Sequence, residues 1–104
     1  MQVKTFDKSI KKFIKLLGKP AGPKLVRTIE LLEKFNYKLG MPHSKKISKH
    51  LFELRTYGQQ NIRIVYAFHK NKIILLHGFI KKAQKIPQKE LKAATQKLKS
   101  LTSK

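Results

Sequence analysis

The sequence predicts a small α+β domain in which an antiparallel sheet packs against helices. Between residues 50 and 80, three short apolar segments are separated by turn-forming residues, a pattern typical of a three-stranded antiparallel meander. The segments before and after it repeat apolar residues at helical spacing. With 104 residues, the chain has the length of about one small domain. We therefore expect a single domain over residues 1–104.

The N-terminal segment predicts a strand followed by a helix. Residues 2–6 alternate polar and apolar side chains, which indicates a short edge strand that would join the meander. Asp7 then stands where a helix cap is expected, and apolar residues recur at helical spacing as far as Leu17. Gly18 ends this first helix.

A second helix is predicted with Pro23 in its first turn, where the missing N–H of proline costs nothing. Gly40 and Pro42 end it, since glycine tolerates a left-handed cap and proline prevents continuation. Its buried stripe comprises Leu25, Ile29, Leu32 and Leu39. A basic loop, residues 43–49, is expected to follow.

The three strands of the meander are predicted at residues 50–57, 61–68 and 72–80. Residues 58–61 and the pair Lys70-Asn71 form the connecting turns, which are short enough to require antiparallel neighbours. The third strand is apolar on both faces. We therefore expect it to lie inside the sheet with cover on each side.

A third helix is predicted to open at Pro87 and to continue near the end of the chain. Lysines occupy most of its surface, whereas one face is apolar. That face is formed by Leu91, Ala94, Leu98 and Leu101.

The composition predicts a folded, strongly cationic protein. The formal charge of +20 results from 25 Lys and Arg against 5 Asp and Glu, so polyanions are the expected partners. A membrane is not expected as a partner, because no apolar run approaches the roughly 20 residues that span a bilayer. The N-terminus lacks the apolar core of a signal peptide, and we expect a cytoplasmic protein. The absence of cysteine excludes thiol catalysis.

The acidic and histidine residues give no pattern typical of a metal or paired-carboxylate site. The five acidic residues are scattered along the chain: Asp7, Glu30, Glu33, Glu53 and Glu90. The four histidines lack zinc-type spacing: His43, His50, His69 and His77. No glycine-rich phosphate loop is present either. We therefore expect neither a metal nor another cofactor.

What remains is phosphate chemistry by basic side chains. Arginine forks neutralise the crowded phosphate formed when RNA is cleaved, because they hold two oxygens at once. Arg63 is a strong candidate, since an arginine within the apolar run IRIVYAF requires a cleft or a partner. Arg55 is a second candidate, although it could instead pair with Glu53 on the same strand face.

Other residues near these arginines could bind RNA or transfer protons. His77 could titrate in catalysis, or it could be a core histidine that is satisfied by a neighbour. Tyr66 could stack on a base, or it could pack in the sheet. Lys82 is a further candidate for catalysis. The candidate RNA-binding lysines lie in the basic loop and after the last strand: Lys45, Lys46, Lys49, Lys81 and Lys85. The run KKAQK after that strand could instead be only a solvated start to the last helix.

The segments LFELR, RIVYAF and LLHGFIKKAQKIP, preceded by LLEKFNYKLGMPH, occur in an order and spacing that resemble a known family. They resemble the phage-derived Gp49-like, HigB-type branch of the RelE/ParE toxin superfamily. The likeness extends from about Phe6 to Leu98. It implies a microbial-RNase-like fold in which helices cover one face of an antiparallel sheet and the other face forms a basic cleft.

The resemblance also implies an activity and partners. Such a protein would be the toxin of a type II toxin-antitoxin system, a ribosome-dependent mRNA endonuclease inhibited by a cognate antitoxin of helix-turn-helix, HigA type. Arg55, Arg63 and Lys82 match basic residues of the family's site. Better-known members carry basic residues where this chain has Leu51 and Glu53.

The same members use a tyrosine after the position of Lys85, where this chain has none. His77, Lys81 and Lys85 are the substitutes we expect for the general base and the stacking partner. Two alternatives remain open at this point. Related ParE proteins act on DNA gyrase, and a non-catalytic RNA-binding or ribosome-binding protein would also explain the charge.

Overall fold

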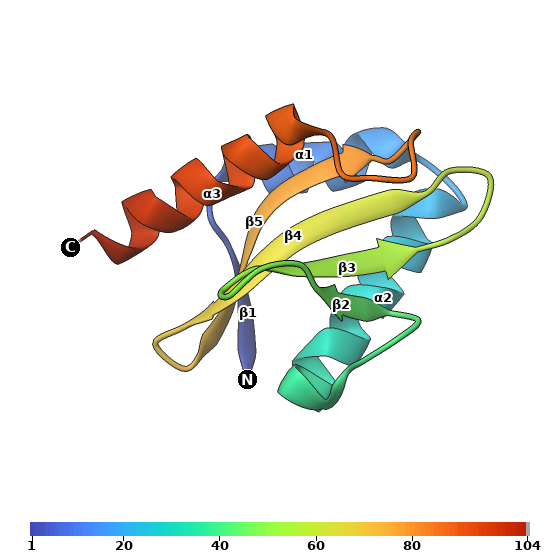
Figure 1. Ribbon diagram of the computed structural model, residues 1–104. Coiled ribbons are helices and arrows are strands. Elements are labelled where there is room, and N and C mark those ends of the chain that lie inside the picture. Colours follow the sequence, from blue (N-terminus) through green and yellow to red (C-terminus); the bar gives the residue numbers. More distant parts are fainter. Residues whose placement is uncertain (104) are drawn as a thin grey trace.

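The computed structural model describes residues 1–103 as a five-stranded mixed sheet with helices on both faces (Figure 1). The strand order is β1-β5-β4-β3-β2. The elements in chain order are β1 (Gln2–Thr5), α1 (Lys8–Leu17), α2 (Ala21–Phe35), the 3₁₀ turn η1 (Asn36–Lys38), β2 (Ser44–Lys46), β3 (Phe52–Thr56), β4 (Ile62–His69), β5 (Lys72–Ile80) and α3 (Gln88–Thr102).

The predicted meander is confirmed. Strands β3, β4 and β5 pair in antiparallel fashion with consecutive neighbours. Lys70 and Asn71 connect β4 to β5 with φ of 48° and 62°, the left-handed conformation that tight hairpin turns need. As predicted, β5 lies inside the sheet, between β1 and β4.

The expectation of a purely antiparallel sheet is wrong for the N-terminal strand. β1 is an edge strand as predicted, but it runs parallel to β5, with Gln2 opposite Lys72. An alternating pattern identifies a strand without identifying its partner or direction. Here the partner, β5, lies far from β1 in the sequence, with two α-helices and strands β2 to β4 between them.

The basic loop predicted at residues 43–49 contains a fifth strand, β2. It pairs antiparallel with β3, and its Ser44 side chain is buried while Lys45 and Lys46 are exposed. Exposed lysines are common on edge strands, where they prevent pairing with other chains. A segment with so few apolar residues carries no alternation that would have revealed it.

The second helix is shorter than predicted. α2 ends at Phe35, because Asn36 adopts a φ of 54° that the helix cannot continue through. Leu39, predicted to belong to the helix stripe, lies beyond η1 and packs against the core from there. The first helix is capped by Asp7 as predicted, with the Asp7 carboxylate accepting a 3.0 Å hydrogen bond from the Ser9 N–H.

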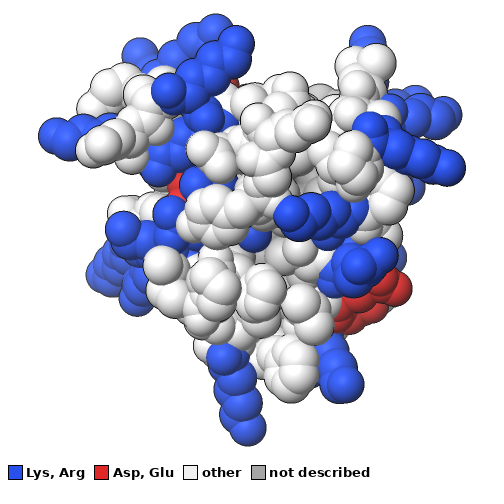
Figure 2. All heavy atoms as spheres, turned by 90° about the vertical axis from the view of Figure 1, so that its right-hand side faces the viewer, with Lys and Arg blue, Asp and Glu red and all other residues white. Residues whose placement is uncertain are grey.

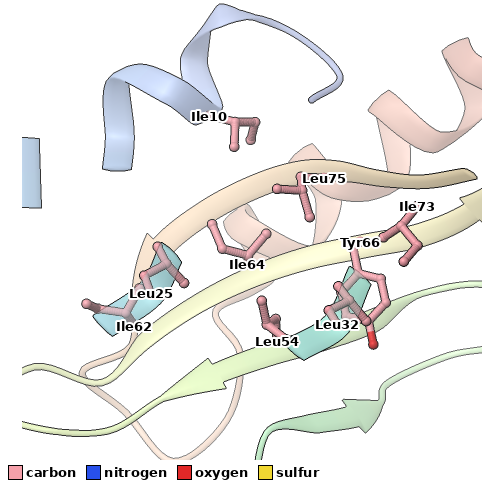
Figure 3. Packing of buried hydrophobic residues seen from close by; sticks show 9 residues of the cluster. All are labelled: Ile10, Leu25, Leu32, Leu54, Ile62, Ile64, Tyr66, Ile73 and Leu75. Carbon is pink, nitrogen blue, oxygen red and sulfur yellow. The ribbon is translucent and has the colours of Figure 1, made fainter. Parts of the chain in front are cut away.

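Two apolar clusters lie on opposite faces of the sheet. On the α1/α2 face, side chains from both helices meet β3, β4 and β5 (Figure 3), and the cluster comprises Ile10, Leu25, Leu32, Leu54, Ile62, Ile64, Tyr66, Ile73 and Leu75. On the α3 face, a second cluster comprises Leu51, Val65, Ala67, Ile74, Leu76, Phe79 and Ala94. β5 contributes to both clusters, which confirms that it is covered on each side.

Helix α3 covers only part of its face. It lies over β5 and β4 (Figure 1) and leaves the corresponding face of β3 without a helix. Charged side chains of β3 and β4 occupy this uncovered area, which is where the candidate site lies. Within residues 1–103, no helix is long and apolar enough to cross a membrane.

Candidate phosphate-binding site

Two arginines face each other across neighbouring strands on the α3 face. Arg55 of β3 and Arg63 of β4 are directly opposite in the register. Like charges in this position repel each other, and Glu53 compensates for the repulsion. Its Oε1 lies 3.4 Å from Nε of Arg55 and 3.5 Å from Nε of Arg63. The alternative interpretation of Arg55 as a partner of Glu53 is therefore confirmed, and Arg63 joins the same pair.

Most of this cluster is buried. The side chains of Glu53 and Arg63 are 2% and 3% exposed, whereas that of Arg55 is 14% exposed. Nη1 of Arg63 donates to the Ile62 carbonyl oxygen at 3.0 Å. Burial lowers the pKa of Arg63, while the Glu53 carboxylate acts in the opposite direction. Arg63 thus forms the floor of the site, and Arg55 is its more accessible arginine.

Several polar atoms of the cluster have unused hydrogen-bonding capacity. Oε2 of Glu53 and the Nε atoms of both arginines are buried without a hydrogen-bond partner. Leaving such an atom unsatisfied costs about 1–3 kcal/mol. The two Nε atoms contact Oε1 of Glu53 only at ion-pair distance, so they could still donate to a ligand oxygen, whereas Oε2 of Glu53 needs a donor.

An exposed aromatic ring lies against both arginines. The Tyr57 ring centroid is 5.4 Å from the guanidinium carbon of Arg55 and 5.0 Å from that of Arg63. These are cation–π distances, and Tyr57 is 42% exposed. Sequence analysis did not select Tyr57. The alternation through Glu53 and Arg55 was the available signal, because it puts Tyr57 on the same strand face.

The base-stacking role considered for Tyr66 is wrong, because the side chain is only 1% exposed. Tyr66 belongs to the cluster on the α1/α2 face (Figure 3). Its hydroxyl makes a hydrogen bond with the Ser44 hydroxyl. Burial raises the pKa of Tyr66, and the bond to Ser44 opposes that shift. The alternative interpretation of Tyr66 as a packing residue is confirmed.

A hollow next to the arginines collects the predicted basic residues that follow β5. Lys81 donates its N–H to the Asn61 carbonyl oxygen at 2.7 Å, so the chain stays beside β4 after β5 ends. Lys81, Lys82 and Arg63 consequently line one open hollow of about 290 Å³. Lys85 lies outside it. We call the side chains of Arg55, Arg63, Lys81 and Lys82 the basic site.

The lysines of the former loop segment divide between the two faces. Lys45 is the cross-strand partner of Glu53 and therefore shares the face of the basic site. Lys46 lies on the other face, with Nζ 5.9 Å from the ring centroid of Phe52. Lys49 is exposed in the turn between β2 and β3. Of these three candidates, the structure brings Lys45 to the basic site.

His77 does not lie in the hollow of the basic site. Its Nε2 pairs with Oε1 of Glu90 at 2.9 Å, which joins β5 to the start of α3. Its side chain is 20% exposed, and its ring stacks near Phe79. This geometry matches the interpretation of a histidine satisfied by a neighbour. His43 accepts the Arg55 N–H through its backbone oxygen at 2.8 Å.

Charge at the site is supplied by protein cations. Within the part of the chain that the structure describes, no three His, Cys, Asp or Glu residues are grouped to hold a metal ion. Figure 2 shows the side of the molecule on which β3 is connected to β4, with basic side chains spread around a middle region of uncharged atoms. The arrangement is able to bind a phosphate group through guanidinium and ammonium donors.

The sequence model of the family described as phage-derived protein Gp49-like (DUF891) matches residues 12–99. The chain belongs to the Gp49-like family. This is a RelE/HigB-type toxin family, and the matched region contains the whole basic site. No curated protein matches the chain at a significant level of similarity.

Proposed function

We propose that this Gp49-like protein is the toxin of a type II toxin-antitoxin system and that it cleaves mRNA on the ribosome. One observation carries the proposal: the opposed arginines of β3 and β4 adjoin a hollow lined by Lys81 and Lys82. The family membership supports a toxin. We also propose that the five-stranded sheet with its three helices is a variant of the RelE-type, microbial-RNase-like fold.

In the proposed reaction, the 2′-hydroxyl of the RNA attacks the adjacent phosphate and forms a 2′,3′-cyclic phosphate. The bond between phosphorus and the 5′-oxygen breaks, and the leaving 5′-oxygen takes up a proton from solvent. During this displacement, the site has to stabilise extra negative charge on the phosphate oxygens. Arg55 is partly exposed and Lys82 is exposed, so both would reach the phosphate before Arg63. Arg63 lies below them and adds its charge from the floor of the hollow.

The proton of the 2′-hydroxyl needs an acceptor. His77 is held by Glu90, away from the hollow, so it does not serve here. Glu53 touches both arginines, and its Oε2 has no hydrogen-bond partner. We expect Glu53 to accept the proton once phosphate binding has drawn the arginines toward the substrate.

The cleavage hypothesis is tested by primer extension on a translated message with purified ribosomes. Arg55→Ala and Lys82→Ala should each reduce new 5′ ends by about 10²–10³-fold, the usual loss when one donor to a developing charge is removed. Lys89→Ala, at an exposed position of α3, is the matched control and should cleave normally. Unchanged cleavage in both site variants would exclude this site.

The two alternative functions give different outcomes in cells that produce the protein. Broken DNA with intact messages would favour the gyrase-directed ParE activity, and ribosome binding without any cleavage would favour a non-catalytic RNA-binding protein. Arg63→Ala is less suitable as a primary test, because Arg63 is buried and its loss disturbs the fold.

A second consequence is a steep salt dependence. If the protein binds mRNA and ribosomal RNA through phosphates, its affinity for ribosomes should fall linearly with salt on logarithmic axes. Six phosphate contacts would correspond to a loss of about 10³-fold between 50 and 200 mM salt. Sedimentation with ribosomes at several salt concentrations measures this slope, and a flat response contradicts phosphate-dominated binding.

The cognate antitoxin is part of the proposal. A formal charge of +20 favours an acidic partner, which would neutralise the basic site or block access of the toxin to the ribosome. We expect a helix-turn-helix protein of HigA type encoded beside this chain. Co-expression of the neighbouring reading frame should restore growth to cells that produce the toxin.

A further inference from the structure

The loop between β3 and β4, residues 57–61, separates two hollows. Asn61 lines the hollow of Arg63 and Lys82, whereas residues 57–60 line a second pocket on the other side of the loop. This second pocket lies between the loop and the start of α2, and its volume is about 250 Å³. Consecutive residues of the loop, Gln60 and Asn61, therefore line different hollows.

The second pocket combines flat apolar walls with amide groups. Leu17, Ala21 and Ile62 provide apolar surface, and Gln59 and Gln60 provide side-chain amides that both donate and accept hydrogen bonds. Such a combination suits a planar group with polar edges. A nucleobase has this character, since its faces are apolar and its edges carry donors and acceptors.

The pocket is also cationic. Lys19 and Lys24 line it, and no aspartate or glutamate does. Lys24 contributes to the structure of the pocket as well, because its ammonium group donates to the Tyr57 carbonyl oxygen and so connects α2 to the loop. A ligand that carries a phosphate beside a base meets complementary charge here.

Tyr57 connects the pocket to the basic site. It lines the pocket, and its ring lies against both arginine side chains. Tyr57 is therefore the residue over which an RNA strand with a phosphate on the basic site would reach the pocket.

We propose that this pocket binds one nucleobase of the RNA strand whose phosphate lies on the basic site. The proposal rests on the proposed function for the nature of the strand. The volume supports a single base, because pockets that enclose drug-sized ligands measure roughly 300–1,000 Å³. Base recognition by Gln59 and Gln60 would give the protein a nucleotide preference next to its cleavage position.

The test measures base binding by the isolated protein, without ribosomes. The protein is titrated with each of the four ribonucleoside 5′-monophosphates and with ribose 5-phosphate, and the side-chain amide NMR signals of Gln59 and Gln60 are followed. We expect one base to bind at least 5-fold more tightly than ribose 5-phosphate and to shift both amide signals. The variant Gln59→Ala/Gln60→Ala should lose about 10-fold in affinity for that base, the effect of two lost hydrogen bonds.

Gln96→Ala is the matched control, because Gln96 is an exposed glutamine on α3 outside the pocket. Its affinity should equal that of the original protein. Equal binding of all four nucleotides and ribose 5-phosphate would overturn the proposal, as would an unchanged affinity in the double variant. Both variants replace exposed side chains, and the NMR spectrum itself reports whether each remains folded.

The outcome is independent of the cleavage experiment. Base-selective binding without mRNA cleavage would support the pocket and contradict the proposed function. Cleavage at Arg55-dependent positions without base-selective binding would do the reverse. Where both occur, mapping of 5′ ends should show that the double variant cuts with a weaker nucleotide preference than Gln96→Ala.

Discussion

The two faces of the sheet are built from the same strands and differ in chemistry at β3 and at the start of β4. On the α1/α2 face, β3 and β4 present Leu54, Ile62 and Ile64 to two helices. On the α3 face, the intervening positions are Glu53, Arg55 and Arg63. Alternation along a strand makes this division possible, because successive side chains point to opposite faces. One set of strands therefore supplies both the core and the basic site.

The difference shows what each face contributes. Apolar burial on the α1/α2 face stabilises the fold, at about 25 cal/mol per Å² removed from water. The buried charges on the α3 face contribute little, because their desolvation offsets their attraction. A cluster with unpaired polar atoms is poorly explained by stability and well explained by ligand binding.

The substitution expected to change stability most lies on the α3 face, at Glu53. Glu53→Gln should lower the free energy of unfolding by about 3 kcal/mol, because it leaves two opposed arginines without a buried counter-charge. Urea denaturation measures this change. Glu30→Gln, at an exposed position of α2, is the control and should stay within about 0.5 kcal/mol.

A double variant tests whether the lost stability comes from the buried arginine charge that Glu53 no longer balances. In Glu53→Gln/Arg63→Gln, the buried positive charge is removed together with its partner, and most of the lost stability should return. Equal stability of Glu53→Gln and the original protein would mean that the carboxylate does not hold the arginine pair. The fold of the charged face would then depend on the surrounding packing alone.

An intermediate effect is expected on the α1/α2 face, where α1 approaches β5 closely. A Cβ atom at Gly78 would lie 2.5 Å from Cδ2 of Phe13 and 2.9 Å from Cδ1 of Ile64. Gly78→Ala should therefore destabilise the protein by about 1–3 kcal/mol through overpacking. Thermal unfolding measures it, with Gly40→Ala as the control, because a Cβ there meets no atom within 4 Å.

No change in the unfolding temperature of Gly78→Ala would show that α1 shifts away from the sheet at little cost. The contact of Phe13 with Gly78 would then be easier to displace than the short distances in the structure indicate. A loss in Gly40→Ala equal to that in Gly78→Ala would point to backbone effects instead of contact with Phe13.

The smallest effect concerns Asp7, which links the helices of the two faces. Its carboxylate caps α1 and pairs with Lys97 of α3 at 3.3 Å. The pKa of Asp7 is lowered, first by the hydrogen bond from the Ser9 side chain and also by Lys97. Asp7→Ala should cost about 1 kcal/mol at pH 7, the usual value for a lost cap.

The pH dependence follows from the direction of that shift. A lowered pKa means that Asp7 stabilises the fold above its ordinary value of 3.8 and that this contribution is lost as the pH falls below it. The stability difference between the original protein and Asp7→Ala should therefore narrow in acid. Asp7→Asn keeps a good cap without the charge and should show a smaller loss at pH 7. A difference that stays constant down to pH 2 would contradict the assignment.

Local patterns were sufficient for most elements of the fold. The meander, the cap at Asp7 and the third helix depend on turn residues, a capping side chain and helical spacing, all of which are short-range signals. The direction of β1 and the existence of β2 depend on partners elsewhere in the chain. The early end of α2 depends on the backbone conformation of Asn36, for which the sequence carried no clear signal.

The residues of the candidate site were likewise predictable in part, whereas their contacts depend on the fold. Arg55, Arg63, Lys81 and Lys82 were selected from residue type and position, and the structure brings them together around one hollow or next to it. The alternation through Glu53 and Arg55 indicated the face of Tyr57, but its contact with both arginines depends on the pairing of β3 with β4. The burial of Tyr66 depends on the helices that cover its face of the sheet. His77 was correctly treated as ambiguous until its contact with Glu90 was known.

The sequence by itself determined most of the strands and helices and which residues are basic, because periodicity and residue type are local properties. Only the tertiary structure decided that Glu53 lies between two arginines and that Lys82 joins Arg63, because strand register and the path of the chain after β5 bring them together. It also decided that α3 stops short of β3, which left one strand face free of a helix. Contacts between distant segments result from packing of the whole chain, and no local pattern contains them.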